Sequence, residues 1–247
     1  MKRLDLAPAP PAEQLAADEA LLDACEAGDS EETLIFWEPR DTFVVVGYAN
    51  KIATEVNVAA CAAAGIPIFR RCSGGGTVVQ MAGGLNYSLI LRIEENGDTR
   101  NITAANQFIM EKNRAAITQA LATTADPVPP AAITVRGHTD LCVGDIKFAG
   151  NAQRRRKNFL LFHGTLLLNC DLSLISKLLW MPSQQPDYRG NRPHEKFVTN
   201  LNRPVAQVKA AFAKVWGANE ELKNPPPAEI ARLAREKYST REWNFKF

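Results

Sequence analysis

The sequence predicts an α+β domain, a mixed α/β arrangement in which largely antiparallel and mixed sheets are flanked by helices. Two observations support this fold class. Short runs of β-branched and aromatic residues follow one another across turn signals, which is typical of hairpins. Segments with apolar residues at three- and four-residue spacing are separate insertions and do not alternate regularly with the strands. A doubly wound parallel sheet requires that alternation, so the pattern argues against a Rossmann domain.

Composition and charge place the chain among ordinary globular proteins. Its 247 residues fit one domain, and its 46% hydrophobic and 23% charged residues are close to globular averages. A net charge of +2 is too small to predict nucleic-acid binding, and no apolar run approaches the length of a membrane span. The five cysteines include no C-x-x-C pair, which favours a reducing compartment. We therefore expect a cytoplasmic protein without nucleic-acid or membrane partners.

The first half of the chain begins with an amphipathic helix and continues mainly as strands. Pro10 and Pro11 precede an apolar-periodic segment that Gly28 ends. Two apolar runs then flank the turn-forming residues 39–41, which predicts a hairpin. The expected elements are a helix at 12–28, a hairpin of strands at 33–38 and 42–48, a helix at 55–64, and strands at 66–71, 77–80 and 85–93.

The second half contains the longest predicted helix and a series of hairpins. Helix formers with a helical apolar repeat run over residues 102–124, and the segment DPVPP ends that helix. The basic run at residues 154–157 should be a solvated hairpin tip. Residues 181–193, which include several prolines and arginines, should form an exposed loop. The other expected elements are strands at 134–143, 146–153 and 159–169, and helices at 172–180, 205–216 and 227–238.

The most unusual stretch joins two arginines to three consecutive glycines, in the segment RRCSGGGTVV at residues 70–79. Consecutive glycines expose backbone N–H groups and let a ligand approach the chain closely. The arginines supply positive charge for a phosphate or a carboxylate. The segment is neither a Walker A loop nor a G-x-G-x-x-G motif. It predicts an anion-binding loop; spacing alone leaves open an ordinary glycine-rich turn between exposed arginines.

A second unusual stretch, GDIKFAGNAQ at residues 144–153, places one lysine before small residues on a predicted strand. Side chains alternate along a strand, and this alternation would turn Lys147 inward. Gly150 and Ala152 would leave room beside it for a ligand. A single lysine is more often a solvated surface charge, and this stretch alone does not separate the two interpretations.

Together the two stretches resemble the lipoate-protein ligase A family, within the biotin and lipoyl ligase superfamily. The resemblance extends along nearly the whole chain. It includes the segments AADEALL, FWEP, GYAN, LNYSL, TDL, K-x-x-G-N-A-Q, HGTLLLN, VTNL and EWNF. It implies a single catalytic domain over residues 1–247, with the fold of class II aminoacyl-tRNA synthetases and biotin-protein ligases.

The resemblance also implies an activity. Such an enzyme activates lipoate or octanoate with ATP and Mg²⁺ as an acyl-adenylate, then transfers the acyl group to a lysine of a lipoyl carrier protein. The carrier would be an H-protein, a dehydrogenase E2 or a similar lipoate-binding protein. Lys147 matches the lysine that bridges the lipoate carboxylate and the α-phosphate, and it is the implied catalytic residue. A cation is needed there because a carboxylate must approach an anionic phosphate.

The family pattern implies two groups of contact residues. Those implied for ATP or the adenylate are Arg71, Gly76, Thr77, Val78, Val79, Asp140 and Lys147. Those implied for lipoate are Arg70, Ser73, Gly74, Gly75, Asn86, Lys147, Gly150, Ala152 and His163. Asp140 could equally be an ordinary turn aspartate, and His163 a satisfied core histidine. The sequence names no metal ligands.

Two departures from the family pattern affect these expectations. Gln80 and Met81 stand where the family often has His-Asp, which weakens any metal or nucleotide role there. The chain ends at Phe247, soon after EWNF, so we expect no C-terminal accessory domain. Transfer would then use a separate accessory subunit or the loops of this chain.

Three rival functions remain open at this point. An octanoyl transferase that moves the acyl group between carriers without ATP would need a thiolate nucleophile. That branch has its cysteine well before the motif lysine, where this chain reads PAAI at residues 130–133. Cys142 fits poorly, and Cys72 is the thiol to test, although a small buried apolar role is more usual for such a residue. The other rivals are biotin ligation and a binding module without catalysis.

Overall fold

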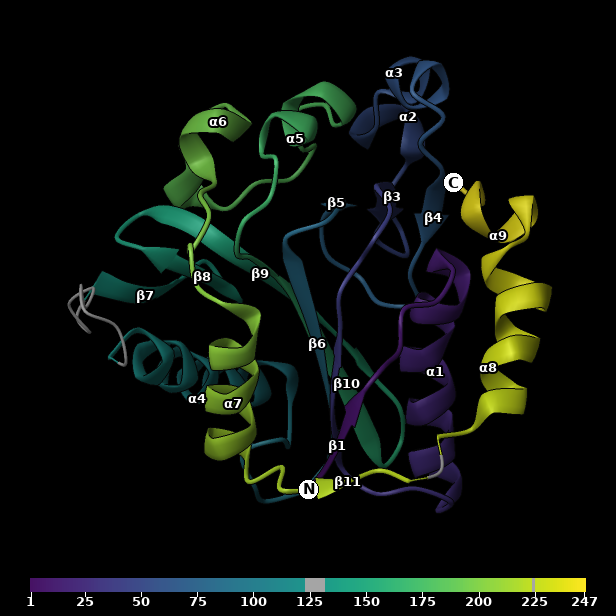
Figure 1. The fold of residues 1–247 in the computed structure, drawn as a ribbon, viewed down its shortest axis with the longest axis vertical. Coiled ribbons are helices and arrows are strands. Elements are labelled where there is room, and N and C mark those ends of the chain that lie inside the picture. The colour runs from purple at the N-terminus through teal and green to yellow at the C-terminus, as the bar shows by residue number, and fades with distance from the viewer. Residues whose placement is uncertain (123–131, 224) are drawn as a thin grey trace.

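The computed structural model describes residues 1–122, 132–223 and 225–247. Within these ranges the strands form an eight-stranded sheet, in the order β11-β1-β2-β6-β10-β9-β8-β7, and a three-stranded sheet, in the order β4-β3-β5 (Figure 1). The strands of the large sheet are β1 (Lys2–Asp5), β2 (Thr33–Trp37), β6 (Gly84–Arg92), β7 (Ile133–Arg136), β8 (Asp140–Val143), β9 (Ile146–Arg155), β10 (Phe159–Leu167) and β11 (Glu220–Glu221). Those of the small sheet are β3 (Phe43–Val46), β4 (Ile68–Arg70) and β5 (Val78–Gln80).

The pairing confirms the predicted α+β class with largely antiparallel and mixed sheets. Six consecutive strands of the large sheet, from β2 through β7 in its order, pair antiparallel, and β8–β9 and β9–β10 form hairpins as the pattern predicts. The segment expected as one strand at 134–143 is itself a hairpin of β7 and β8. Parallel pairs occur where β1 meets β2 and β11, and where β3 meets β4. The strands therefore do not alternate with helices as they would in a doubly wound sheet.

Helices cover both faces of the large sheet (Figure 1). Helix α1 (Pro11–Ala27) and α8 (Pro227–Leu233) lie on one face, and α4 (Ile102–Ala122) and α7 (Val205–Trp216) lie on the other. Strand β2 shows why both faces need cover: Leu34 and Phe36 enter one hydrophobic cluster, while Ile35 and Trp37 enter the opposite one. Successive side chains of a strand point to opposite faces, so an entirely apolar strand is buried on both sides.

The small sheet is closed by short helices at the upper end of Figure 1. A third hydrophobic cluster joins Val44, Val46 and Val79 of this sheet to the helical segments that cover it. These segments are α2 (Ile52–Glu55), α3 (Val58–Ala63) and α5 (Ser173–Leu178), and α6 (His194–Phe197) lies beside α5. The small sheet and its helices hold the glycine-rich segment against the large sheet.

Several sequence expectations need correction. The two strands predicted as a hairpin do not pair: β2 joins the large sheet, whereas β3 starts the small one. The helix expected at 55–64 is broken into α2 and α3, because Asn57 caps the second helix through its side chain. Strand β1 was not predicted. The predicted end of the long helix at 123–124 and the DPVPP segment lie outside the described residues.

The loop expected at 181–193 is not simply exposed. It contains a short 3-10 helix, Asp187–Arg189, in which Arg189 is buried and its guanidinium faces the Phe197 ring at 4.4 Å. Aromatic stacking stabilises a guanidinium that has left water. The last predicted helix begins as α8 and ends in a π-helical turn, Ala234–Tyr238, before α9 (Arg241–Asn244).

The predicted solvated tip at residues 154–157 is also wrong in part. The Arg156 guanidinium lies 2.7 Å from Asp23, and that of Arg154 lies 3.4 Å from Glu19. Both carboxylates belong to α1, so these arginines tie the β9–β10 hairpin to that helix. Lys157 is the exposed member of the run. In the ranges that the structure covers, no helix is long and apolar enough to cross a membrane.

Candidate active site

The glycine-rich segment forms a loop between β4 and β5, which we call the glycine loop (residues 71–77). Its first half lies against the segment that follows β3, where the Tyr48 amide donates to the Ser73 carbonyl at 2.8 Å. Gly47 lies directly behind Gly75, and a Cβ on Gly47 would overlap the Gly75 carbonyl oxygen. Gly75 itself has a positive φ of 84°, a conformation that favours glycine.

Arg71 holds the glycine loop from inside. Its Nε donates to Ser73 Oγ at 3.0 Å, and its Nη2 donates to the carbonyls of Gly74 at 2.6 Å and Gly76 at 2.7 Å. The side chain is buried, and desolvation lowers the pKa of its guanidinium to about 10, which still leaves it charged at neutral pH. Arg71 therefore places a positive charge beneath the loop that the sequence predicts to bind an anion.

Arg70 lies elsewhere, which corrects the expectation that it contacts the acyl substrate. The residue is fully buried, and its Nη1 donates to the carbonyls of Gly47, Tyr48 and Asn50 at 2.8–2.9 Å. Its Nε donates to the carbonyls of Trp243 and Asn244 at 3.2 Å. Arg70 thus connects the C-terminal segment to the loop after β3, and we leave it out of the candidate ligand contacts.

Lys147 begins strand β9 and is held by a short chain of polar contacts. Its ammonium lies 2.8 Å from Asp140 Oδ1 of β8, and the Tyr188 hydroxyl donates to Asp140 Oδ2 at 2.7 Å. The Lys147 side chain is 26% exposed and that of Asp140 is 13% exposed, so solvent reaches the lysine more readily than its partner. The 187–189 turn brings Tyr188 to this position, and the pKa of its phenol is raised by burial and by Asp140.

The small residues after Lys147 give it room. A Cβ on Gly150 would lie 2.7 Å from the Lys147 Nζ, so the side chain folds across that glycine. Two positions further, the Ala152 Cβ would lie 3.2 Å from a Cβ on Gly75. Strand β9 therefore folds Lys147 across Gly150 and, two positions further, places Ala152 beside Gly75 of the glycine loop. The two unusual stretches of the sequence come into contact at Ala152 and Gly75.

His163 of β10 lies between a serine and a carboxylate. Its Nε2 is 2.5 Å from Ser73 Oγ, and its Nδ1 is 2.6 Å from Asp18 Oδ2 of α1. The Ser88 hydroxyl of β6 donates to the other Asp18 oxygen at 2.6 Å. The side chain of His163 is 11% exposed, which is intermediate between a core histidine and a surface one. The structure thus brings His163 and Ser73 together, as expected for two residues of one site.

The remaining candidate contact residues are less accessible to solvent. Asn86 is buried on β6, and its amide exchanges two hydrogen bonds of 2.8 Å with the Gln80 amide. Val79 is buried in the third hydrophobic cluster, while Val78 packs beside the second, so the side chains of both serve packing. Thr77 Oγ1 accepts from the Asn50 amide at 3.3 Å. Thr77 and Val78 retain partial exposure, whereas Val79 and Asn86 are buried.

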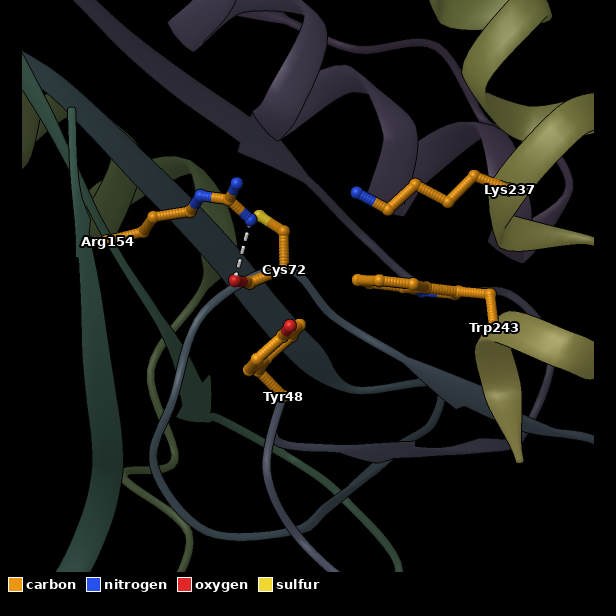
Figure 2. Close-up of a pocket in the computed structure, with 5 residues that line it drawn as sticks. All are labelled: Tyr48, Cys72, Arg154, Lys237 and Trp243. Carbon is orange, nitrogen blue, oxygen red and sulfur yellow. Dashed lines mark hydrogen bonds between the residues drawn. The ribbon is translucent and has the colours of Figure 1, made fainter. Parts of the chain in front are cut away.

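A separate cavity of about 280 Å³ lies behind the glycine loop (Figure 2). Lys237 and Trp243 of the C-terminal elements face Cys72 and Arg154 across it, and Tyr48 lies below. Arg154 donates to the Cys72 carbonyl at 2.9 Å, and Arg154 and Lys237 share the buried Glu19 carboxylate. Burial and, secondarily, Glu19 raise the pKa of the Cys72 thiol to about 11. Cys72 is therefore a protonated thiol at neutral pH, which argues against a thiolate nucleophile.

Three residues of this region were missed by sequence reasoning. Asp18 lies within the AADEALL segment, but nothing in the sequence indicates that α1 turns it toward β10. Tyr188 lies in the segment expected to be an exposed loop. Gly47 is part of GYAN, and its glycine requirement follows from a contact with Gly75 that is distant in sequence.

This chain is similar to known proteins along most of its length. The model of the lipoyl protein ligase A/B catalytic domain matches residues 10–216. A curated relative, octanoyltransferase LipM of Geobacillus kaustophilus, is 29% identical over 96% of this chain and 95% of that relative. Lipoate-protein ligase A subunit 1 of Thermoplasma acidophilum is 28% identical over 93% of this chain and 90% of that relative.

Solved structures show the same fold. The bipartite lipoate protein ligase of Thermoplasma acidophilum, determined with its E2 lipoyl domain, superposes with a TM-score of 0.77 at 26% identity, covering 99% of this chain and 96% of the other. A lipoate-protein ligase A bound with ATP superposes with a TM-score of 0.74 at 26% identity, covering 99% and 98%. The family model spans most of the chain, and the relatives include both ligases and octanoyltransferases. This chain therefore belongs to the lipoyl protein ligase A/B catalytic domain family and is an amide-forming enzyme of that family.

Proposed function

We propose that this protein is an ATP-dependent lipoate-protein ligase, which forms lipoyl- or octanoyl-adenylate and transfers the acyl group to a lysine of a lipoyl carrier. The observation that carries the proposal is the position of Lys147, an ammonium held by Asp140 and folded across Gly150, on the strand that contacts the glycine loop at Ala152. The similar ligase bound with ATP supports ATP as the activating substrate.

In this mechanism Lys147 lies between the lipoate carboxylate and the α-phosphate and lowers the repulsion between the two anions. Two unit charges about 4 Å apart interact by about 4 kcal/mol at the effective dielectric of a protein surface, so one cation at this point changes the barrier substantially. Lysine suits the position because its compact ammonium can contact both partners. Asp140 orients the ammonium before substrates bind, and the Tyr188 hydroxyl orients Asp140.

The glycine loop is proposed to hold the nucleotide and the acyl group from the other side. Gly74 and Gly76 have open space where a side chain would begin, so a ligand can approach the backbone closely there. Arg71 adds positive charge below the loop. Together with Gly75, Gly76 and Thr77, it would contact the nucleotide through backbone groups and charge, while Ser73, Gly74, Ala152 and His163 would border the acyl chain.

Mg²⁺ fits this donor set in a limited way. The ion usually binds one or two carboxylates together with substrate phosphates, and Asp140 offers a carboxylate oxygen next to Lys147. When bound, Mg²⁺ would supply neutralisation of the pyrophosphate leaving group. Within the described parts of the chain, no three His, Cys, Asp or Glu side chains gather into a cluster that could hold a metal ion.

The acceptor is proposed to be a small lipoyl-type domain that presents a lysine on a tight turn, as in an H-protein or a dehydrogenase E2. A separate accessory subunit is a second partner to test, since the similar archaeal ligase is described as bipartite. Five free cysteines fit a reducing cytoplasm. The basic run offers a weaker docking surface than its sequence suggests, because Arg154 and Arg156 are already paired with carboxylates of α1.

A second candidate, octanoyl transfer without ATP, is favoured by the similarity to octanoyltransferase LipM. A cysteine mechanism for it has little support. Burial is the largest influence on each of the five thiols and raises the pKa of every one. A thiol of raised pKa contributes little thiolate at neutral pH.

ATP–pyrophosphate exchange with lipoate, octanoate or biotin separates these functions. We expect exchange with lipoate and octanoate only. Exchange with biotin alone would support biotin ligation, and carrier-dependent octanoyl transfer in the absence of exchange would support the transferase. A protein that binds lipoate without either reaction would be a binding module.

Lys147→Ala should reduce exchange by about 10²–10³-fold, because it removes the cation that offsets the two anions. The fold should be unaffected, since a partly exposed strand lysine contributes about 0.5 kcal/mol or less to stability. Lys157→Ala, which changes an exposed lysine in the turn that follows the same strand, is the matched control and should keep full exchange. Full exchange by Lys147→Ala would refute the mechanism.

A further inference from the structure

Ser73, His163 and Asp18 form a continuous hydrogen-bonded chain, and the adenylation mechanism does not use its capacity for proton transfer. Ser73 Oγ lies 2.5 Å from His163 Nε2, and His163 Nδ1 lies 2.6 Å from Asp18 Oδ2. The three residues come from the glycine loop, β10 and α1, which are distant in sequence. A hydroxyl, an imidazole and a carboxylate in this order are the groups that activate a serine as a nucleophile.

The surrounding hydrogen-bond donors determine which atom donates and which accepts in each of these hydrogen bonds. Arg71 Nε donates to Ser73 Oγ at 3.0 Å, so the serine proton is directed to His163 Nε2. Ser88 donates to Asp18 Oδ1 at 2.6 Å, and the other Asp18 oxygen accepts from His163 Nδ1. An imidazole that donates through Nδ1 carries its lone pair on Nε2. His163 is therefore oriented as a base toward the Ser73 hydroxyl.

The position of Ser73 also suits acyl chemistry. The residue precedes Gly74, beside which a side chain would find open space, so an acyl carbonyl can approach from that side. Ser73 is 1% exposed, which keeps bulk water from an ester formed there. The Arg71 guanidinium, whose Nε and Nη2 donate to Ser73 and to loop carbonyls, adds a positive charge next to the hydroxyl that favours a developing oxyanion.

We propose that Ser73 is an acyl-accepting nucleophile, with His163 as its general base and Asp18 as the residue that orients His163. Through it, this enzyme would move a medium-chain acyl group from a thioester to a protein lysine without ATP. The inference rests on the acyl site and lysine acceptor of the proposed function, but not on adenylation.

The reaction is balanced without a further reactant. Ser73 Oγ attacks the thioester carbonyl while His163 Nε2 accepts the hydroxyl proton; the C–S bond breaks, and the leaving thiolate takes that proton. In the second half, the amine of the acceptor lysine attacks the serine ester and gives a proton to His163. The C–O bond then breaks, and Ser73 Oγ recovers the proton as the amide forms.

The test uses the full chain and the octanoyl thioester of N-acetylcysteamine, without ATP. Intact mass and peptide mapping should find one octanoyl group on Ser73, resistant to the neutral hydroxylamine that cleaves thioesters. Asp18→Asn should slow labelling by about 10²–10⁴-fold, as expected when a base loses its orienting carboxylate. Cys72→Ser is the matched control and should keep the label, because it changes the adjacent thiol only.

Ser73→Ala should carry no label, and Ser73→Cys should carry a hydroxylamine-sensitive thioester, which identifies the position even where alanine disturbs the loop. An unlabelled wild-type protein, or a label confined to a cysteine, would overturn the inference. ATP–pyrophosphate exchange is measured on the same preparation. Exchange without Ser73 labelling overturns this inference and leaves the ligase proposal, whereas labelling without exchange supports this inference and overturns the ligase proposal.

Discussion

Gly47 packs directly against the backbone of Gly75, and this contact lets the glycine loop lie close to the segment after β3. A Cβ at Gly47 would overlap the carbonyl oxygen of Gly75 and approach that of Gly74 at 3.3 Å. Backbone atoms cannot move aside as the end of a flexible side chain can. The conformation of the glycine loop therefore depends on Gly47, which lies outside the glycine-rich segment.

Gly47→Ala should destabilise the protein by about 1–3 kcal/mol, the usual cost of forcing atoms into a packed region. Urea unfolding followed by circular dichroism measures the change. Gly74→Ala is the control, because a Cβ there meets no heavy atom within 4 Å, and its stability should change by about 0.5 kcal/mol or less. Equal stability of the Gly47 variant and wild type would show that the loop can shift without cost.

The pKa of the Glu19 carboxyl is set by the few residues that surround it. Burial by itself raises the pKa of this carboxyl, but hydrogen bonds and charge from Lys237, with Tyr238 and Arg154, lower it overall below its ordinary value of 4.5. A carboxyl whose pKa is lower in the folded state adds stability that is complete above the ordinary pKa. That contribution is lost as the pH falls through the lowered value.

We therefore expect Glu19→Gln to reduce the free energy of unfolding near neutral pH, and the gap from wild type to narrow as the pH falls below about 4.5. Urea titrations at several pH values would measure it. Glu13→Gln, an exposed glutamate of the same helix, should show no such gap. A gap that is constant down to pH 3 would mean that the Glu19 carboxylate is not the source.

At the scale of elements, Arg70 joins the C-terminal segment to the loop after β3. Arg70 donates to carbonyls of the loop after β3 and to the carbonyls of Trp243 and Asn244. In return, the Trp243 indole donates to the Arg70 carbonyl at 2.8 Å. The family match ends at residue 216, so this attachment concerns elements beyond the matched region.

Arg70→Lys should destabilise the protein by about 2–4 kcal/mol, because an ammonium cannot satisfy carbonyls that a planar guanidinium reaches in several directions. Hydrogen exchange should become faster in α9 than in α4. Arg40→Lys, at an exposed arginine, is the control and should leave both rates unchanged. Uniform acceleration in α9 and α4 would indicate global loss of stability rather than release of the C-terminal segment.

The strand β9 is the element that assembles the site. Its first residues carry Lys147 and Gly150, its middle places Ala152 against the glycine loop, and its end carries Arg154 into the cavity of Figure 2. Segment 198–199 holds its start, since the Thr199 amide donates to the Lys147 carbonyl at 2.8 Å. The VTNL segment of the sequence thus has a defined role in positioning Lys147.

For the whole molecule, ligand binding should appear as added stability. Lipoyl-adenylate would contact the glycine loop of the small sheet and β9 of the large sheet together, so it should favour the folded state over the unfolded one. When the concentration of lipoyl-adenylate is one hundred times its Kd, the free energy of unfolding should rise by about 2.7 kcal/mol. This corresponds to a rise in Tm of roughly 5–10 °C for a chain of this size. Thermal unfolding with biotinyl-adenylate is the control and should show a much smaller rise; equal shifts would contradict lipoyl specificity.

The sequence was sufficient for those features that depend on local periodicity and residue type. It predicted the antiparallel strand series, the helices at 12–28 and 205–216, and a glycine-rich loop between two strands. Hydrophobic spacing and turn residues act over a few positions, so they can be recognised along the chain. The family resemblance, carried by many short segments in order, is confirmed by the match over residues 10–216.

Only the tertiary structure decided how distant segments meet. It moved Arg70 away from the candidate ligand contacts, paired the basic run with α1, separated the two strands expected as a hairpin, and brought Asp18 and Tyr188 to His163 and Asp140. Burial and hydrogen-bond partners depend on neighbours contributed by other elements, which residue spacing does not encode. For this reason the motifs of this protein were visible in its sequence, whereas the groups that orient them were not.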